Sequence, residues 1–251
     1  MLKVRIVPLL LLKGSSLVKS VNYRDHRVVG DAVSAIKVFS QRSADEMVIL
    51  DLDANARGEL NTDLLSRIAT FCNMPVAFGG GINSAAKADQ AFRAGADKLI
   101  LNSLFFLRPA LVEDIVYNYG SQSICLSIDV RRCGSAYDIF INNATLKIQD
   151  CDLKTALRRA NDIGIGEILI NCIDRDGVMG GMDLELVKFC RDNTPLPLIA
   201  AGGIGSKEDF FDGFQSGADA IGAGSIFHWV GESIVGIKSF LDNQGINVRL
   251  P

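Results

Sequence analysis

The sequence predicts an α/β protein, a closed (β/α)8 TIM barrel made of two similar half-barrels. Apolar runs of strand length alternate with amphipathic helical stretches along all 251 residues, and 48% of the residues are hydrophobic. The apolar runs show little alternation with polar residues, which is typical of parallel strands buried on both faces. Short glycine motifs also recur at a nearly constant offset. A chain of this length suits one barrel, so a single domain over residues 1–251 is expected.

The predicted elements follow one another in regular alternation. Strands are expected near residues 4–11, 46–52, 75–79, 97–101, 123–129, 166–172, 197–201 and 219–223. Helices are expected near residues 31–43, 61–73, 84–94, 108–119, 153–163, 183–192, 206–215 and 231–242. Eight such units of about 30 residues fit a closed barrel better than an open doubly wound sheet.

One segment interrupts this alternation after the fifth strand. Residues 136–141 and 144–148 are two strand-like runs separated by Asn142 and Asn143. Two such runs around a short polar turn predict a β-hairpin. Residues 134–148 are therefore expected to form an inserted hairpin.

An internal repeat supports the half-barrel organisation. Gly80–Ile82 recurs as Gly202–Ile204, 122 residues later in the chain. Ala94–Asp97 recurs as Ser216–Asp219 at the same offset. The repeated unit spans four strands, so two related sets of loops are expected to face each other across the barrel mouth. The repeat predicts a fold and says nothing by itself about activity.

The charge balance and the cysteine pattern exclude several classes of function. The net charge is −3 and no basic cluster occurs, which argues against a nucleic-acid partner. The six cysteines include no CxxC pair, so reduced thiols are expected rather than disulfides or zinc, and neither a metal nor a cofactor is expected. The apolar run at residues 9–12 is too short for a signal peptide or a membrane span. We expect a cytoplasmic protein that does not associate with membranes.

Two pairs of loops, each pair with a glycine-rich member, are candidate phosphate sites, which we call the first and the second phosphate cradle. The first cradle consists of residues 79–84 after strand three and Asn102–Ser103 after strand four. The second consists of residues 201–206 after strand seven and Gly224–Ser225 after strand eight. Glycine lets backbone N–H groups approach an anion closely, although a lone Gly-Gly pair is more often a tight turn. Because the arrangement is duplicated, a substrate with a phosphate at each end is expected.

Several carboxylates follow the predicted strands and are candidates for acid–base chemistry. They are Asp51, Asp53, Asp129, Asp174 and Asp176. Asp129 ends the fifth strand, opposite the first strand in a barrel, and could act as a general acid–base group. The matching position at the end of the first strand is Leu11, which cannot transfer a proton. Asp174 and Asp176 lie in a polar turn, where capping of the turn is the simpler role.

Four charged residues mark the other end of the strands. Arg5, Glu46, Lys98 and Glu167 lie at or near the starts of strands one, two, four and six. Their alternating signs could close the lower end of the barrel as a salt-bridged ring. Ordinary solvated side chains at strand starts are the simpler interpretation from these positions alone.

The whole chain resembles HisF, the cyclase subunit of imidazole glycerol phosphate synthase. The resemblance rests on motifs that run from end to end: residues 5–7, 79–82, 94–98, 120–122, 166–169, 174–177, 218–220, 225–228 and 245–250. It implies a (β/α)8 barrel with a HisH glutaminase as partner, which releases ammonia at the lower end of the barrel. The ammonia then crosses the barrel and reacts with a bis-phosphorylated substrate. The products implied are imidazole glycerol phosphate and AICAR.

The resemblance also implies roles for individual residues. The four charged residues at the strand starts would gate the ammonia path, and Asp129 would be a general acid–base group. Phosphate and substrate contacts would come from Lys19 in the first loop, Asp51, Gly81, Asn102, Ser103, Asp176, Gly177, Gly203 and Ser225.

Departures from the family pattern cluster at the mouth. The first strand of the family ends in an aspartate where this chain has Leu11, and Val178–Met179 replace a Thr-Lys pair after strand six. Two functions remain open. One is the cyclase of histidine biosynthesis, with Asp51 or Asp176 compensating for Leu11. The other is a paralogue that relays ammonia to a separate amidotransferase in amidino-sugar and surface polysaccharide synthesis. The related HisA isomerase fits less well, because it also requires an acid on the first strand.

Overall fold

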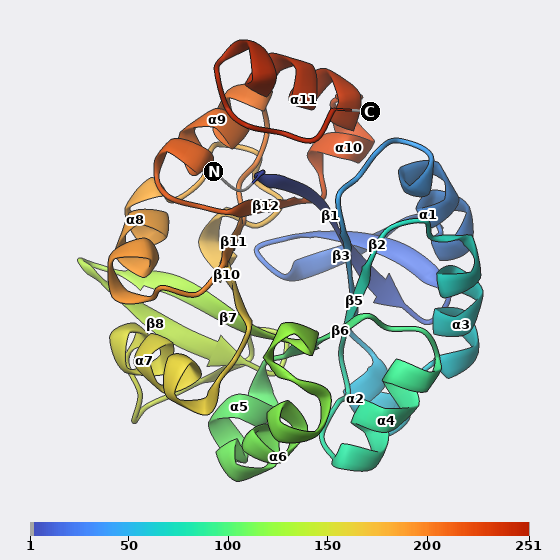
Figure 1. Cartoon of the computed structure of the whole chain (residues 1–251), viewed down its shortest axis with the longest axis vertical. Helices are drawn as coiled ribbons and strands as arrows, with labels where there is room; N and C mark the ends of the chain where they lie inside the picture. The colour runs from blue at the N-terminus through green and yellow to red at the C-terminus, as the bar shows by residue number, and fades with distance from the viewer. Residues whose placement is uncertain (1–2, 251) are drawn as a thin grey trace.

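The computed structural model describes residues 3–250 and confirms the predicted barrel (Figure 1). Parallel strands pair in the closed order β1-β4-β5-β6-β7-β10-β11-β12, with β12 returning to β1. Their bounds are Arg5–Lys13 for β1, Met47–Asp51 for β4, Val76–Gly79 for β5, Lys98–Leu101 for β6, Ile124–Cys133 for β7, Glu167–Cys172 for β10, Leu198–Ala201 for β11 and Ala220–Ala223 for β12. Each expected strand is present at its expected position.

Helices surround the strands on the outside of the barrel (Figure 1). The long ones are α1 (Ala32–Ser40), α3 (Thr62–Phe71), α4 (Ala85–Arg93), α6 (Pro109–Tyr119), α7 (Leu153–Ile163), α8 (Leu184–Asn193), α9 (Lys207–Gln215) and α11 (Ile234–Asn243). All match the predicted helices. The sequence did not predict five short helical turns, of which four follow a strand and one, η1, precedes a strand. They are α2 (Ala54–Arg57), α5 (Ser103–Leu107), η1 (Ser121–Ser123), η2 (Ile173–Arg175) and α10 (Ile226–Trp229). They are too short to show a helical period.

Two apolar layers hold the barrel together. Outward-facing strand residues such as Ile6 and Leu10 pack against the helices. Inward-facing residues such as Val7, Val48 and Leu169 fill the barrel interior. Burial on both faces is the reason that the strands read as continuous apolar runs. Within residues 3–250, no helix has the length and apolar character needed to cross a membrane.

The half-barrel repeat has a structural cause. Asp97 accepts a hydrogen bond from the amide of Val76 at 2.8 Å, and Asp219 accepts one from the amide of Leu198 at 2.9 Å. Each aspartate thus ties the starts of two neighbouring strands in its own half. Gly80 must be glycine because a Cβ atom would lie 2.1 Å from the backbone oxygen of Asp51.

An antiparallel hairpin follows the first strand of each half. In the second half, β8 (Ala136–Ile141) pairs with the extended end of β7 and with β9 (Leu146–Lys147). In the first half, β2 (Ser16–Val21) pairs with the end of β1 and with β3 (Arg24–Asp31). The expectation of a loop here was wrong, because Lys19 lies on the strand β2 and is buried. Figure 1 shows the β2–β3 hairpin in blue, lying across the mouth of the barrel.

Candidate functional site

A cavity of about 670 Å³ opens at the carboxyl ends of the strands in the first half. A volume of this size lies within the usual range for small-molecule sites. Its lining brings together five of the predicted site residues: Asp51, Gly81, Asn102, Ser103 and Asp129. The first phosphate cradle therefore forms one wall of an open cavity.

The first cradle offers donors to this cavity. Gly81 has a φ of 71°, and a Cβ atom there would lie 2.7 Å from the Cβ of Ala54. The Ser103 hydroxyl accepts a hydrogen bond from the Asn142 amide at 3.2 Å. Among the described residues, the amides of Gly81, Ile82 and Asn83 have no hydrogen-bond partner. Free backbone amides in a glycine-rich turn suit an anion.

Asp129 sits at the centre of a hydrogen-bond network in the same cavity and is 6% exposed. Its Oδ1 accepts hydrogen bonds from the Tyr23 hydroxyl at 3.1 Å and from the Asn171 Nδ2 at 3.2 Å. Its Oδ2 accepts one from the Asn102 Nδ2 at 3.3 Å. Burial raises the pKa of the Asp129 carboxyl to about 6, although the bonds from Asn171 and Tyr23 oppose the shift. A carboxyl that titrates near neutral pH can both give and take a proton.

Sequence reasoning did not single out Tyr23 or Asn171. Asn171 lies inside the apolar strand β10, and its Nδ2 donates to the Tyr23 hydroxyl at 3.0 Å. Tyr23 lies at the tip of the β2–β3 hairpin with a φ of 60°. A bulky residue in this left-handed region is uncommon, so the backbone conformation at the tip is strained.

Asp51 is engaged in an ion pair. Its carboxylate lies 2.5 Å from the guanidinium of Arg57 and accepts the backbone amide of Asp53 at 3.1 Å. Asp51 is 4% exposed. These contacts fix the loop after β4, and the pairing with Arg57 leaves Asp51 poorly suited to replace a lost catalytic acid.

The position opposite Asp129 is apolar. Leu11 is 4% exposed and packs in a small cluster with Val18 and Leu52, against Leu9 and Leu50. A carboxylate at this position would lie in an apolar environment unless another group paired with it. Leu11 itself therefore offers no proton donor or acceptor to the mouth.

The second phosphate cradle is nearly closed. The cavity beside Asp176, Gly177, Gly203 and Ser225 measures about 30 Å³, room for little more than one or two water molecules. The Lys19 side chain lines this cavity, and its Nζ donates to the backbone oxygen of Leu9 at 3.1 Å. Burial lowers the pKa of Lys19 to about 8, opposed by the charge of Asp176.

The β2–β3 hairpin is bonded to this cradle. The Ser20 hydroxyl donates to the Asp176 carboxylate at 3.2 Å. The backbone amide of Asn22 donates to the backbone oxygen of Asp176 at 2.8 Å. A Cβ atom on Gly177 would lie 1.9 Å from the backbone oxygen of Ser20. Asp176 is thus a partner of the hairpin, and burial raises the pKa of its carboxyl.

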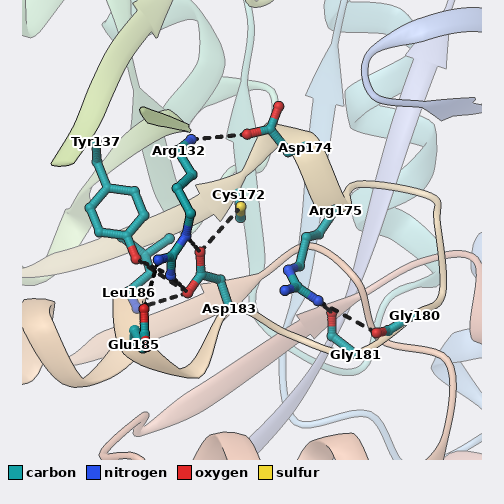
Figure 2. Close-up of polar contacts among 10 residues, drawn as sticks. All are labelled: Arg132, Tyr137, Cys172, Asp174, Arg175, Gly180, Gly181, Asp183, Glu185 and Leu186. Carbon is teal, nitrogen blue, oxygen red and sulfur yellow. Dashed lines mark hydrogen bonds and ion pairs between the residues drawn. The ribbon is translucent and has the colours of Figure 1, made fainter. Parts of the chain in front are cut away.

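A separate polar cluster fixes the loop between β10 and α8 (Figure 2). Arg132 pairs with Asp183 at 2.6 Å and with Glu185 at 2.6 Å. The Asp174 carboxylate accepts a hydrogen bond from the backbone amide of Arg132 at 2.9 Å. The Arg175 guanidinium donates one to the backbone oxygen of Gly181 at 3.1 Å. Asp174 therefore has a structural role, as its position in a polar turn suggested.

The four charged residues at the strand starts form a closed ring. Arg5 contacts Glu46 at 2.5 Å and also pairs with Glu167. Lys98 contacts Glu46 at 2.9 Å and Glu167 at 2.8 Å. Glu46 and Glu167 are 2% and 5% exposed, so the simpler interpretation as solvated side chains was wrong. Each carboxylate is held by both cations at the lower end of the barrel interior.

Comparison with known proteins identifies the family. A family model described as "Histidine biosynthesis protein" matches residues 5–230. The "Imidazole glycerol phosphate synthase subunit HisF" of Exiguobacterium sibiricum is 37% identical over 250 residues, which cover 99% of this chain and 100% of that protein. Two relatives bear the name "Putative imidazole glycerol phosphate synthase subunit hisF2". The one from Pseudomonas aeruginosa is 36% identical over 99% of this chain and 100% of its own length, and the one from Campylobacter jejuni 34% over 100% of both.

These matches extend over the same strands, cradles and charged ring that the structure describes. The chain belongs to the histidine biosynthesis protein family and is HisF-like over its full length.

Proposed function

We propose that this chain is the barrel subunit of a glutamine amidotransferase complex and accepts ammonia from a HisH-like glutaminase. The observation that carries the proposal is the closed ring of Arg5, Glu46, Lys98 and Glu167 at the lower end of the barrel. Above it the interior is lined with apolar side chains such as Val7, Val48 and Leu169. An apolar interior disfavours ions much more than a neutral molecule of ammonia.

The mouth of the barrel supports relay of the ammonia to a separate amidotransferase. Leu11 removes the acid of the first strand and lies in an apolar cluster. Lys19 lines the small cavity of the second cradle, where a bis-phosphorylated substrate would place its second phosphate. On this proposal the acceptor belongs to amidino-sugar and surface polysaccharide synthesis. The protein would work in the cytoplasm with a glutaminase on one face and the amidotransferase on the other.

A second candidate is the cyclase of histidine biosynthesis. It is favoured by Asp129, whose carboxyl has a pKa of about 6, and by the open first cradle. The cyclase would have to work without a carboxylate at the end of the first strand, where this chain has Leu11. Loss of one member of an acid–base pair typically lowers the rate about 10² to 10⁴-fold.

One assay separates the two candidates. The purified chain is given ammonium salt and the bis-phosphorylated substrate, and imidazole glycerol phosphate is measured beside a HisF relative. We expect no turnover in the wild-type chain and partial recovery in Leu11→Asp. A wild-type rate within about tenfold of the relative's, smaller than the loss expected for a missing acid, would favour the cyclase.

The ring is tested separately in the complete complex. We expect Arg5→Ala and Lys98→Ala to slow product formation from glutamine more than product formation from ammonium salt. The reason is that either change leaves two buried glutamates with a single cation at the entrance. Asp192→Ala, on an exposed face of α8, is the control. Equal losses with both nitrogen sources would argue against a gate.

A further inference from the structure

The two phosphate cradles share their glycine pattern but differ in what already occupies them. In the first cradle, the loop 79–84 borders a cavity of about 670 Å³. In the second, the corresponding loop borders a cavity of only about 30 Å³, and the Lys19 side chain is part of its lining. A Cβ atom added to Gly224 would lie only 2.1 Å from the Lys19 Nζ. A phosphate has four oxygens around phosphorus, so it could enter the second cradle only after Lys19 left.

The contacts of the β2–β3 hairpin make Lys19 part of a bonded structure. Three points of the hairpin are anchored. Lys19 bonds to the backbone of Leu9, Ser20 and Asn22 bond to Asp176, and Tyr23 bonds to Asp129. Moving the whole hairpin away from the second cradle would break these contacts together and expose the carboxyls of Asp129 and Asp176.

The helices that follow the cradles differ in charge. Ser84 caps α4 and is followed three residues later by Lys87, whereas Ser206 caps α9 and is followed by Asp209. The Asp209 carboxylate accepts the amides of Gly205 and Ser206 at 2.8 and 2.9 Å. An acid at this place occupies the donors that an anion would use and repels a second negative charge.

The first cradle has the opposite features. The amides of Gly81, Ile82 and Asn83 have no partner among residues 3–250. Arg108 also lines the cavity, and no acid within the described residues forms an ion pair with it. The lining of the cavity also includes apolar groups from Leu50, Leu52, Ile100, Ile141 and Leu146.

We propose that the mouth binds a ligand with one phosphate, seated in the first cradle, while the β2–β3 hairpin occupies the place of a second phosphate. The ligand is a small mono-phosphorylated molecule whose other end is uncharged. This ligand class deepens the proposed function. It rests on that proposal in one respect, that the mouth of the barrel is the functional site.

The test is a ³¹P NMR and calorimetric titration with inorganic phosphate, glycerol 3-phosphate and fructose 1,6-bisphosphate. We expect saturation at one phosphate per chain. The Kd of the bisphosphate should lie within about threefold of that of glycerol 3-phosphate, because a second phosphate finds no site. Two phosphates per chain, a bisphosphate bound more than about tenfold tighter, or no saturable binding would each overturn the proposal.

Matched substitutions assign the phosphate to a cradle. Ser103→Asp places a carboxylate in the first cradle and should raise the Kd for glycerol 3-phosphate at least about tenfold, while Ser225→Asp should change it less than about twofold. Arg108→Glu, on an exposed side chain, repeats the first test without disturbing a buried group. The reverse pattern would contradict the assignment.

Failure of this inference can be told apart from failure of the proposed function. Arg5→Ala alters the distant ring and should leave the phosphate titration unchanged. Normal ammonia transfer without phosphate binding would refute only the ligand class. Phosphate binding in the first cradle without coupling to glutamine would refute only the relay.

Discussion

The hairpins after β1 and β7 occupy corresponding places in the two half-barrels, yet they leave the neighbouring phosphate cradles in different states. The β8–β9 hairpin touches the first cradle through the Asn142 amide, 3.2 Å from the Ser103 hydroxyl, and leaves the cavity open. The β2–β3 hairpin enters the second cradle with the Lys19 side chain. Two loop sets with similar glycine motifs thus border cavities of very different size, and a side chain from a neighbouring hairpin lines the smaller one.

The same comparison holds for the strand ends. β7 presents Asp129 to the open cavity, with three side-chain donors around it. β1 presents Leu11 to an apolar cluster. Asp129 therefore lies among polar side chains at the mouth, whereas Leu11 lies among apolar ones. The ring of charges at the other end of the barrel is closed, whereas the two strand ends at the mouth differ in chemistry.

The largest expected effect comes from Gly177→Ala, which forces the hairpin out of the second cradle. Its new Cβ would lie 1.9 Å from the Ser20 oxygen, and its φ is 73°. We expect a loss of about 3 kcal/mol or more in the free energy of unfolding, measured by urea denaturation, with faster proteolysis within residues 16–31.

Gly14→Ala is the matched control for this change. Gly14 has a similar φ of 58° and no atom within 4 Å of the added Cβ. It should cost only the left-handed strain, about 1 to 2 kcal/mol. If Gly177→Ala costs no more than Gly14→Ala, the hairpin is not held against the second cradle.

The next effect is the pH dependence that Asp129 gives to stability. Its carboxyl has a pKa of about 6 in the folded chain against an ordinary value of 3.8. The folded state therefore holds a proton that the unfolded state has lost, and stability falls as the pH rises from about 4 to 6. A shift of this size corresponds to about 3 kcal/mol.

Asp129→Asn should remove this loss. Below pH 4 the variant and the wild type should differ little, and above pH 6 the variant should be more stable by up to about 3 kcal/mol. Urea denaturation at pH 4, 6 and 8 measures the difference. Asp192→Asn, on an exposed residue of α8, is the control. A constant difference across this range would show that burial does not raise the pKa of Asp129.

The barrel could be predicted because its signals are local. Apolar runs such as Met47–Ile49 are buried on both faces, and caps such as Ser84 and Ser206 start the helices with their own hydroxyls. The β2–β3 hairpin could not be predicted in the same way. Most of β3 is exposed and polar, and the turn at Asn22–Tyr23 has no glycine to mark the left-handed backbone that it adopts.

The site was predictable only where a position in the strand order determines the contact. The ring joins residues as far apart in the chain as Arg5 and Glu167. They meet because the parallel strands of a barrel all start at the same end. Whether the second cradle is open depends instead on the position of the Lys19 side chain. The glycine motifs of the two cradles look equivalent in the sequence, since nothing in residues 201–206 shows that Lys19 lies beside them.

The smallest expected effect comes from Tyr23→Phe, which tests the contact between the tip of the β2–β3 hairpin and Asp129 on β7. The change removes only the hydroxyl that donates to Asp129 at 3.1 Å and accepts from Asn171 at 3.0 Å. The pKa of Asp129 should rise further, because that bond lowers it, and NMR titration of the carboxyl carbon measures the change. Unfolding should become easier by about 1 to 2 kcal/mol at pH 8, where Asp129 is charged. Tyr117→Phe, at a side chain that is 90% exposed, should have no effect on either quantity. An unchanged pKa for Asp129 would mean that the hairpin tip and β7 are not coupled, and that the two sides of the mouth act independently.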